Sequence, residues 1–146
     1  MGLDKNKQFK KNLMLKSTEM GLQNCVEWEG FSEHMDQEYL QASIVLNFSE
    51  SESFSFTCQE AMFYGRPVVA TKSGGPQEII EHGKSGLLVD VGDVQSMIHA
   101  LEELISKPEK RNIMALRAYH HVRERFDLGR TRNLLISVYS NALSRK

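Results

Sequence analysis

The pattern of hydrophobic and polar residues changes near residue 93. Before that point, short apolar runs rich in β-branched residues lie at 44–48, 67–71 and 86–89, and each predicts a strand buried in a parallel sheet. Residues 25–28 alternate between apolar and polar side chains and predict a further strand. After residue 93 the apolar residues recur at helical spacing, so the C-terminal part of the chain is predicted to be helical.

Helical spacing also explains the segments between the strands, and glycines such as Gly21 and Gly65 mark helix ends. Helices are predicted, in chain order, over residues 4–20, 34–42, 54–64, 76–81, 93–107, 109–126 and 130–143. Strands that alternate with helices imply right-handed crossovers and a parallel sheet. The sequence therefore predicts an α/β fold, a Rossmann-like parallel sheet with C-terminal helices. It is expected to form a single domain over residues 1–146, with a helical tail from about residue 109.

Length and composition suit one globular domain and exclude several classes of protein. Of the 146 residues, 40% are hydrophobic and 25% charged, with only three prolines, which excludes collagen-like and disordered chains. No apolar run approaches the roughly 20 residues of a membrane span, and we expect no secretory signal. The two cysteines, Cys25 and Cys58, fit the reduced thiols of a cytoplasmic protein better than a disulfide framework.

The formal net charge of −1 hides a segregation of charge along the chain. Residues 1–16 carry five Lys against one Asp, residues 17–107 carry four basic against fifteen acidic residues, and residues 108–146 carry nine basic against three acidic residues. The two basic ends either form solvated helix faces or contact an anionic surface such as a membrane leaflet. No nucleic-acid partner is expected, because the sequence contains no RNP, zinc-finger or Gly-rich single-strand-binding pattern.

Three loops rich in Ser, Gly or acidic residues follow the predicted strands, at 49–55, 72–76 and 90–92. In a doubly wound sheet, ligands bind outside the carboxyl ends of the strands, so these loops mark the expected site. The first loop leads into a helix whose N-terminal N–H groups and dipole favour an anion such as a phosphate. Glu52 and Glu60, with seven residues between them, lie at the start of that helix and about two turns into it. Carboxylates there can accept hydrogen bonds from the hydroxyls of a ribose or a sugar ring.

Each of these residues also has a purely structural interpretation. Glu52 near a helix start complements the helix dipole, and Glu60 lies off the apolar stripe of its helix, as a solvated residue does. Gly74-Gly75, between a strand and a helix, fits a tight turn. From the residues alone, a nucleotide-sugar site and an ordinary solvated surface both remain open.

The combination of motifs resembles one known family. Glu52 and Glu60-Ala61-Met62 match Glu-x7-Glu followed by Ala-Met. The stretches 65–71, 74–78 and 83–89 match Gly-x-Pro-Val-Val-Ala-Thr, Gly-Gly-x-x-Glu and Gly-x-x-Gly-Leu-Leu-Val, and residues 26–31 resemble a Val-x-Phe-x-Gly strand. Over about residues 5–143, the chain resembles the C-terminal, nucleotide-sugar-binding domain of the family 4 (group 1) retaining glycosyltransferases, which have the GT-B fold.

The resemblance implies a role for each residue of the site. Glu60 would bind the ribose hydroxyls of the nucleotide, and Glu52 would be the catalytic carboxylate that faces the donor sugar. The other substrate-binding positions are backbone amides and the glycine pair, at Ser53, Phe54, Ser55, Phe56, Gly74 and Gly75. Many family members have Glu-Gly-Phe-Gly where this chain has Glu52-Ser53-Phe54-Ser55, and serine fits there if neither position needs a positive φ.

Two parts of the family pattern have no counterpart in residues 1–146: the first strand with its Gly-Arg turn and Lys-Gly cations, and the N-terminal acceptor-binding domain. The chain is therefore expected to be the donor half, truncated at its N-terminal strand, of a hexosyltransferase-type enzyme in polysaccharide, glycolipid or glycoprotein biosynthesis, and inactive alone. The alternative is a non-catalytic nucleotide-sugar-binding fragment or subunit that requires a partner chain. A sugar-nucleotide epimerase is a third interpretation, which Glu-x7-Glu-Ala-Met does not favour.

The expected partners are a nucleotide-diphosphate-sugar donor and the missing acceptor domain or a partner chain. We expect no cofactor and no metal, because the five histidines form no metal-ligand pattern and Asp-x-Asp does not occur. The expected location is the cytoplasm, or the cytoplasmic face of the membrane if the basic ends contact lipid.

Overall fold

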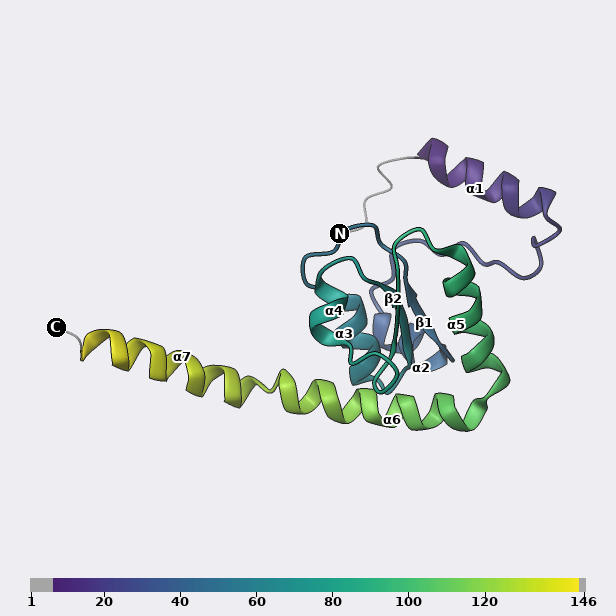
Figure 1. The fold of residues 1–146 in the computed structure, drawn as a ribbon. Helices are drawn as coiled ribbons and strands as arrows, with labels where there is room; N and C mark the ends of the chain where they lie inside the picture. Colours follow the sequence, from purple (N-terminus) through teal and green to yellow (C-terminus); the bar gives the residue numbers. More distant parts are fainter. Residues whose placement is uncertain (1–6, 145–146) are drawn as a thin grey trace. The chain divides into compact units, whose positions relative to one another are not determined.

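The computed structural model describes residues 7–144, and the chain divides into two compact units, Met1–Met35 and Asp36–Lys146. The first unit contains helix α1 (Lys7–Glu19), which confirms the helix predicted over 4–20 at residues 7–19, whereas Met20 lies in the turn that follows (Figure 1). Residues 4–6 of that prediction, including Lys5, lie outside the described residues.

Gly21 ends α1, as predicted. Its φ of 73° lies in the left-handed region, which glycine adopts without steric cost. The Leu22 N–H donates to the Ser17 carbonyl at 2.8 Å and the Gly21 N–H to the Thr18 carbonyl at 2.9 Å. These two bonds form a Schellman motif that satisfies carbonyls left unpaired at the helix end.

The second unit is built on a parallel sheet. Its strands are β1 (Val45–Asn47), β2 (Val68–Thr71) and β3 (Leu87–Val89), in the order β1-β2-β3. Leu46 pairs with Val69, and Ala70 pairs with Leu88. These strands confirm the three strands predicted from the apolar runs, and the α/β fold class with its parallel sheet is confirmed with them. Only β2 is buried throughout. In β1, at one edge of the described sheet, Leu46 is 44% exposed, so the predicted burial of that strand is wrong there.

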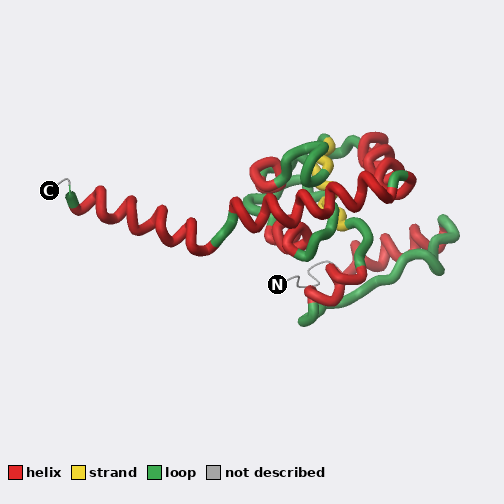
Figure 2. Tube along the Cα trace, turned by 90° about the horizontal axis from the view of Figure 1, so that it is seen from below, coloured by secondary structure: helices red, strands yellow, loops and turns green. Residues whose placement is uncertain are grey.

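Helices α2 (Met35–Gln41), α3 (Phe56–Phe63), α4 (Gly75–Ile79), α5 (Val94–Ser106) and α6 (Pro108–Arg125) surround the sheet on both faces. The last helix, α7 (Leu128–Leu143), extends beyond α6 and away from the sheet (Figure 1). Helix α3 connects β1 to β2 and α4 connects β2 to β3, so each is a crossover between neighbouring parallel strands. The tube view shows the strands between helices, with α6 running along one side (Figure 2).

The core consists of two hydrophobic clusters, because alternate residues of β2 point to opposite faces of the sheet. Val68 and Ala70 belong to the first cluster, together with Met62 of α3 and residues of α2, α4 and α6. Val69 belongs to the second cluster, together with Leu104 of α5 and residues of β3 and α6. Helix α6 therefore contributes to both clusters, which makes the second unit one three-layer structure.

Two of the three C-terminal helices, α5 and α7, begin at side-chain caps. Asp93 accepts a hydrogen bond from the Ser96 N–H at 3.0 Å at the start of α5, and Asp127 accepts one from the Arg130 N–H at 2.8 Å at the start of α7.

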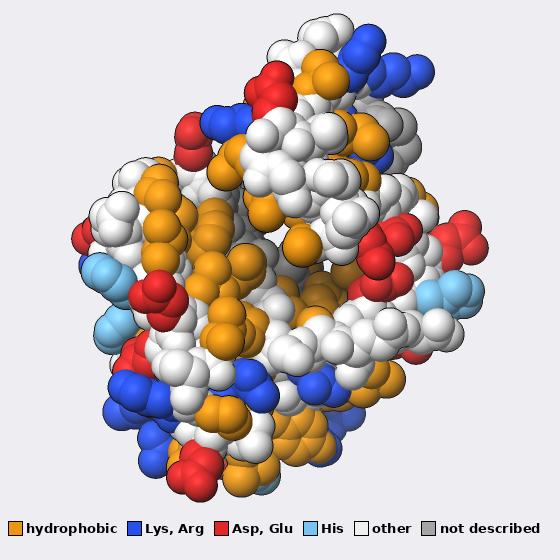
Figure 3. Space-filling view, turned by 90° about the vertical axis from the view of Figure 1, so that its right-hand side faces the viewer, with side chains coloured by type: hydrophobic (Ala, Val, Ile, Leu, Met, Phe, Trp, Pro, Cys, Tyr) orange, Lys and Arg blue, Asp and Glu red, His pale blue; other side chains and the backbone are white. Residues whose placement is uncertain are grey.

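No residue of α7 is buried. Hydrophobic side chains also reach the surface among charged ones on the face shown in Figure 3. Among the described residues, none of the helices combines the length and the apolar character needed to cross a bilayer.

The strand predicted over residues 25–28 is wrong. Cys25 lies in a turn and is exposed, and residues 26–30 have no regular secondary structure. A four-residue alternation becomes a strand only when a neighbouring strand supplies ladder hydrogen bonds, and the described sheet pairs β1, β2 and β3 alone. The Val26 N–H donates instead to the carbonyl of Leu22, four residues earlier, at 3.1 Å.

Candidate functional site

The loops that follow β1 and β2 are joined by backbone hydrogen bonds. The Glu52 N–H donates to the Ser73 carbonyl at 2.9 Å, and the Gly75 N–H donates to the Glu52 carbonyl at 2.6 Å. Together with the parallel bridge between Glu52 and Gly74, these bonds extend the ladder of β1 and β2 beyond the strands. Glu52 is therefore held by its backbone at the carboxyl edge of the sheet.

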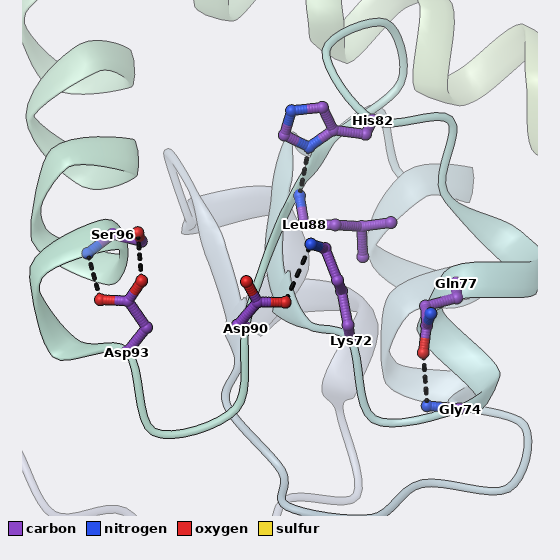
Figure 4. A network of polar contacts seen from close by, with 8 residues as sticks. All are labelled: Lys72, Gly74, Gln77, His82, Leu88, Asp90, Asp93 and Ser96. Atoms are coloured by element: carbon purple, nitrogen blue, oxygen red, sulfur yellow. Dashed lines mark hydrogen bonds and ion pairs between the residues drawn. The ribbon is translucent and has the colours of Figure 1, made fainter.

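The loop after β3 joins the same edge through Lys72. The Lys72 N–H donates to the Val89 carbonyl at 2.8 Å, and its ammonium forms an ion pair with Asp90 at 2.9 Å (Figure 4). The structure thus brings the three predicted loops together at the carboxyl ends of the strands.

Gly74 and Gly75 are required by the close approach of the two loops. A Cβ on Gly74 would lie 2.8 Å from the Glu52 carbonyl oxygen, and one on Gly75 would lie 2.7 Å from backbone atoms of Phe54. Gly74 also has a φ of 111°, which L side chains rarely adopt. A tight turn alone therefore does not account for this glycine pair. The two glycines also let the Glu52 loop pack against the start of α4.

Asn47, at the end of β1, organises the Glu52 loop and was missed by sequence reasoning. Its side-chain amide donates to Ser55 Oγ at 2.7 Å, and its Oδ1 accepts from Ser49 Oγ at 2.7 Å. Thr71 Oγ1 of β2 donates to the Ser49 carbonyl at 2.5 Å. Asn47 is buried at 8% exposure, and a polar residue at the carboxyl end of a buried strand was the available signal, because buried polar groups need partners.

Ser55 has a φ of 49°, and it is the only non-glycine residue with a positive φ in the described part of the chain. Serine was expected to fit at positions 53 and 55 if neither needs a positive φ. Ser55 does not meet that condition. The left-handed conformation costs an L residue roughly 1–2 kcal/mol. Its hydroxyl offsets that cost by capping α3, since it accepts from the Cys58 N–H at 3.4 Å and from Asn47.

Most backbone N–H groups at the start of α3 have no partner in the described part of the chain. Those of Ser53, Phe54, Phe56 and Thr57 donate no hydrogen bond to any described residue, and we call these four groups the α3 amide cluster. The N–H of Ser55, in contrast, donates to Glu52 Oε1 at 3.3 Å. Such N–H groups, with the positive end of the helix dipole, form an environment that favours an anion.

Glu60 lies in α3, and its carboxylate is held by a residue that sequence reasoning also missed. Glu60 Oε2 accepts a hydrogen bond from Tyr39 Oη of α2 at 3.0 Å. Tyr39 is only 4% exposed, and burial, reinforced by the hydrogen bond to Glu60, raises the pKa of its phenol above the usual range. No sequence signal pointed to Tyr39, because it lies 21 residues from its partner.

The structure places the predicted site residues in two groups. Glu52 is joined to Gly74 and Gly75 through the backbone, and to Ser55 through its carboxylate. Glu60 lies on an exposed face of α3 with a separate partner. No hydrogen bond or ion pair between described residues joins the two carboxylates directly.

The aromatic rings of the site lie beside the α3 amide cluster. Phe54 and Phe56 are in edge-to-face contact at 5.2 Å, and Phe54 also contacts Phe126, at the end of α6, at 6.2 Å. Phe56 is 67% exposed. Phe54 thereby anchors the Glu52 loop to α6, while Phe56 remains at the surface.

Metal-binding groups do not gather at this edge. Within residues 7–144, no cluster of three or more His, Cys, Asp or Glu side chains is placed to hold a metal ion. The expectation of a metal-free site stays a prediction. Cys58 belongs to the first core cluster, where burial raises the pKa of its thiol and disfavours the reactive thiolate.

Comparison with known sequences identifies one family. The family model described as "Glycosyl transferases group 1" matches residues 1–121. Among curated proteins, the chain is 41% identical over 101 residues to D-inositol 3-phosphate glycosyltransferase of Corynebacterium urealyticum, which covers 69% of this chain and 24% of that protein. The matched region is therefore about a quarter of the length of that relative.

Solved structures give the same picture. Anabaena Alr3699/HepE in complex with UDP aligns with a TM-score of 0.89 and 30% identity, over 95% of this chain and 38% of that one. The C-terminal domain of a glycosyl transferase group 1 family protein, LpcC of Francisella tularensis, aligns with a TM-score of 0.74 and 30% identity, over 82% of this chain and 63% of that one. HepE was also solved in complex with UDP-glucose.

Proposed function

We propose that this chain, which belongs to the family of group 1 glycosyl transferases, binds the nucleotide-diphosphate-sugar donor of a family 4 enzyme that transfers a hexosyl group with retention. One observation carries the proposal: the α3 amide cluster lies in a single short segment between two carboxylates, Glu52 and Glu60. Phosphates need hydrogen-bond donors and a positive field, whereas sugar and ribose hydroxyls need acceptors.

In this proposal each group has a distinct task. The α3 amide cluster binds the diphosphate and stabilises the charge that develops on it as it leaves. Glu60 accepts hydrogen bonds from the ribose hydroxyls, and Glu52 faces the donor sugar. Gly74 and Gly75 act by letting the Glu52 loop approach closely. UDP and UDP-glucose are the first candidate ligands, because the neighbour HepE was solved with each of them.

The relatives' length supports a second part of the proposal. The chain spans 24% of the curated relative and 38% of HepE, so acceptor binding is assigned to residues outside these 146. Positioning of an acceptor contributes roughly 7–11 kcal/mol to such reactions. The 146 residues alone are therefore expected to bind donor without transferring sugar, which a radiolabelled transfer assay from UDP-glucose to an acceptor extract tests. Transfer by the purified chain alone would contradict this part.

Calorimetric titration with UDP and UDP-glucose tests donor binding. Glu60→Gln keeps the size of the side chain and removes its charge, so UDP affinity is expected to fall by about 1.5–3 kcal/mol, the range for hydrogen bonds to charged groups. Glu52→Gln is expected to leave the affinity for UDP unchanged and to lower the affinity for UDP-glucose. The matched control is Glu102→Gln, on an exposed position of α5, which should change neither affinity. UDP binding that is unaffected by Glu60→Gln would contradict the assignment of Glu60.

A further inference from the structure

Tyr39 stands out in the second unit because it is a buried phenol whose hydroxyl points to an exposed carboxylate. Its hydroxyl donates to Glu60 Oε2 at 3.0 Å. The phenol also stays neutral, and so remains a donor, because burial and the neighbouring Glu60 raise the pKa of Tyr39. A neutral donor against a carboxylate forms a charge-assisted hydrogen bond without adding a second charge.

The ring of Tyr39 is held from several sides. It stacks on Tyr64 with a centroid separation of 5.7 Å and an interplanar angle of 18°. Tyr64 follows directly after α3, so the stack ties α2 to the end of the helix that carries Glu60. The Arg66 guanidinium donates to the Leu40 carbonyl at 2.9 Å and anchors the end of α2 to the segment after α3. The Tyr39 hydroxyl is therefore a fixed point rather than a mobile one.

A glutamate on an exposed helix face normally samples several rotamers, and ordering it on a ligand costs conformational entropy. The hydrogen bond from Tyr39 removes part of that freedom before any ligand arrives. It uses one acceptor position on Oε2, and a carboxylate has about four such positions, so Oε1 and the rest of Oε2 remain able to accept hydroxyls. Pre-ordering of this kind raises affinity by lowering the cost of binding.

We propose that Tyr39 is a positioning residue, which orients the Glu60 carboxylate for the ribose hydroxyls of the donor nucleotide. This inference rests on the proposed donor-binding function and adds to it a residue of α2. Tyr39 acts through Glu60 and is not expected to contact the nucleotide.

The test compares Tyr39→Phe with Tyr64→Phe in the full chain. Both variants remove one phenol hydroxyl from the same stacked pair, but only the first removes the hydrogen bond to Glu60. Tyr39→Phe is expected to weaken UDP binding about fivefold, as loss of one modest hydrogen bond predicts, whereas Tyr64→Phe changes it less than about twofold. With 2′,3′-dideoxyuridine diphosphate as the probe, Tyr39→Phe should have no effect, because that nucleotide lacks the hydroxyls that Glu60 binds.

A double-mutant cycle separates positioning from a general structural effect. In the Glu60→Ala background, Tyr39→Phe should no longer change UDP affinity, because no side-chain acceptor is left to orient. Equal weakening of UDP and the dideoxy nucleotide, or additive effects in the cycle, would overturn the positioning role.

The same cycle in urea unfolding, without nucleotide, reports on the Tyr39–Glu60 hydrogen bond itself. If Glu60→Gln lowers UDP affinity and Tyr39→Phe does not, only the positioning role of Tyr39 is contradicted. If the unfolding cycle shows coupling between Tyr39 and Glu60 but the wild-type chain binds no UDP, the proposed function is contradicted, and the positioning role with it.

Discussion

The loop that carries Glu52 and the helix that carries Glu60 are stabilised in different ways. Glu52 is held by its own backbone, which bonds to Ser73 and Gly75 of the neighbouring loop. Glu60 has the ordinary backbone of an α-helix, and its carboxylate is oriented by Tyr39 from another helix. The first carboxylate therefore depends on close backbone packing, and the second on a single side-chain contact, so different substitutions should disturb each one.

Gly75→Ala is expected to have the largest effect on stability, and it should disturb the loop that carries Glu52 but not the helix that carries Glu60. The new Cβ would lie 2.7 Å from the backbone of Phe54, and backbone cannot move aside as a flexible side chain can. We expect a loss of about 3 kcal/mol in the free energy of unfolding, at the upper end of the range for overpacking, measured by urea unfolding. Gly30→Ala is the matched control, because a Cβ there meets nothing within 4 Å. Equal stability of the two variants would contradict the close packing of the loops.

Asn47→Ala should have the next largest effect, because it removes the amide that bonds to Ser55 and Ser49. The Ser55 hydroxyl is buried and loses one of its two hydrogen-bond partners, and the partly buried Ser49 loses its acceptor. Lost hydrogen bonds at such positions cost about 1–3 kcal/mol, and we expect a loss of about 2 kcal/mol within that range. Amide hydrogen exchange should speed up in residues 49–55 and remain slow in the second half of α3. Asn133→Ala, on the exposed helix α7, is the control. Uniform acceleration across α3 would show that the two carboxylates are not held independently.

Tyr39→Phe should affect the Glu60 side, with a smaller loss of stability of about 1 kcal/mol near neutral pH. Because the pKa of Tyr39 is raised in the folded state, its contribution is complete below the ordinary pKa of 10.0 and is lost as pH rises toward the folded-state pKa. The stability difference between wild type and Tyr39→Phe should therefore be constant up to about pH 10 and decrease above it. Urea unfolding at several alkaline pH values measures this. A difference that grows with pH would contradict the direction of the shift.

Ser55→Gly should have the smallest effect, because two terms oppose each other. Glycine relieves the left-handed φ of 49°, but it also removes the hydroxyl that caps α3 and accepts from Asn47. We expect stability within a few tenths of a kcal/mol of wild type, whereas Ser55→Ala keeps the strain, loses the cap and should cost about 1 kcal/mol. Thermal unfolding of the pair measures the difference. Alanine as stable as glycine would mean that the backbone strain at this position is unimportant.

Much of the fold followed from local pattern. The strands at 44–48, 67–71 and 86–89 were predicted because buried parallel strands are continuous apolar runs, and Gly21 because a helix end needs a left-handed residue. The convergence of the three loops followed from the rule that parallel strands share one carboxyl edge. Residues 25–28 failed because a strand is defined by its neighbour, which an alternation of four residues cannot supply.

The sequence by itself determined which residues of the candidate site belong to one motif, Glu52 and Glu60 among them, because spacing along a loop and a helix is a local property. Only the tertiary structure decided what holds them. The left-handed backbone of Ser55 and the approach of Gly75 to Phe54 depend on how two loops meet. The hydrogen bond from Tyr39 to Glu60 joins residues 21 positions apart. Such contacts form only when folding brings separate elements together, so no periodicity in the sequence records them.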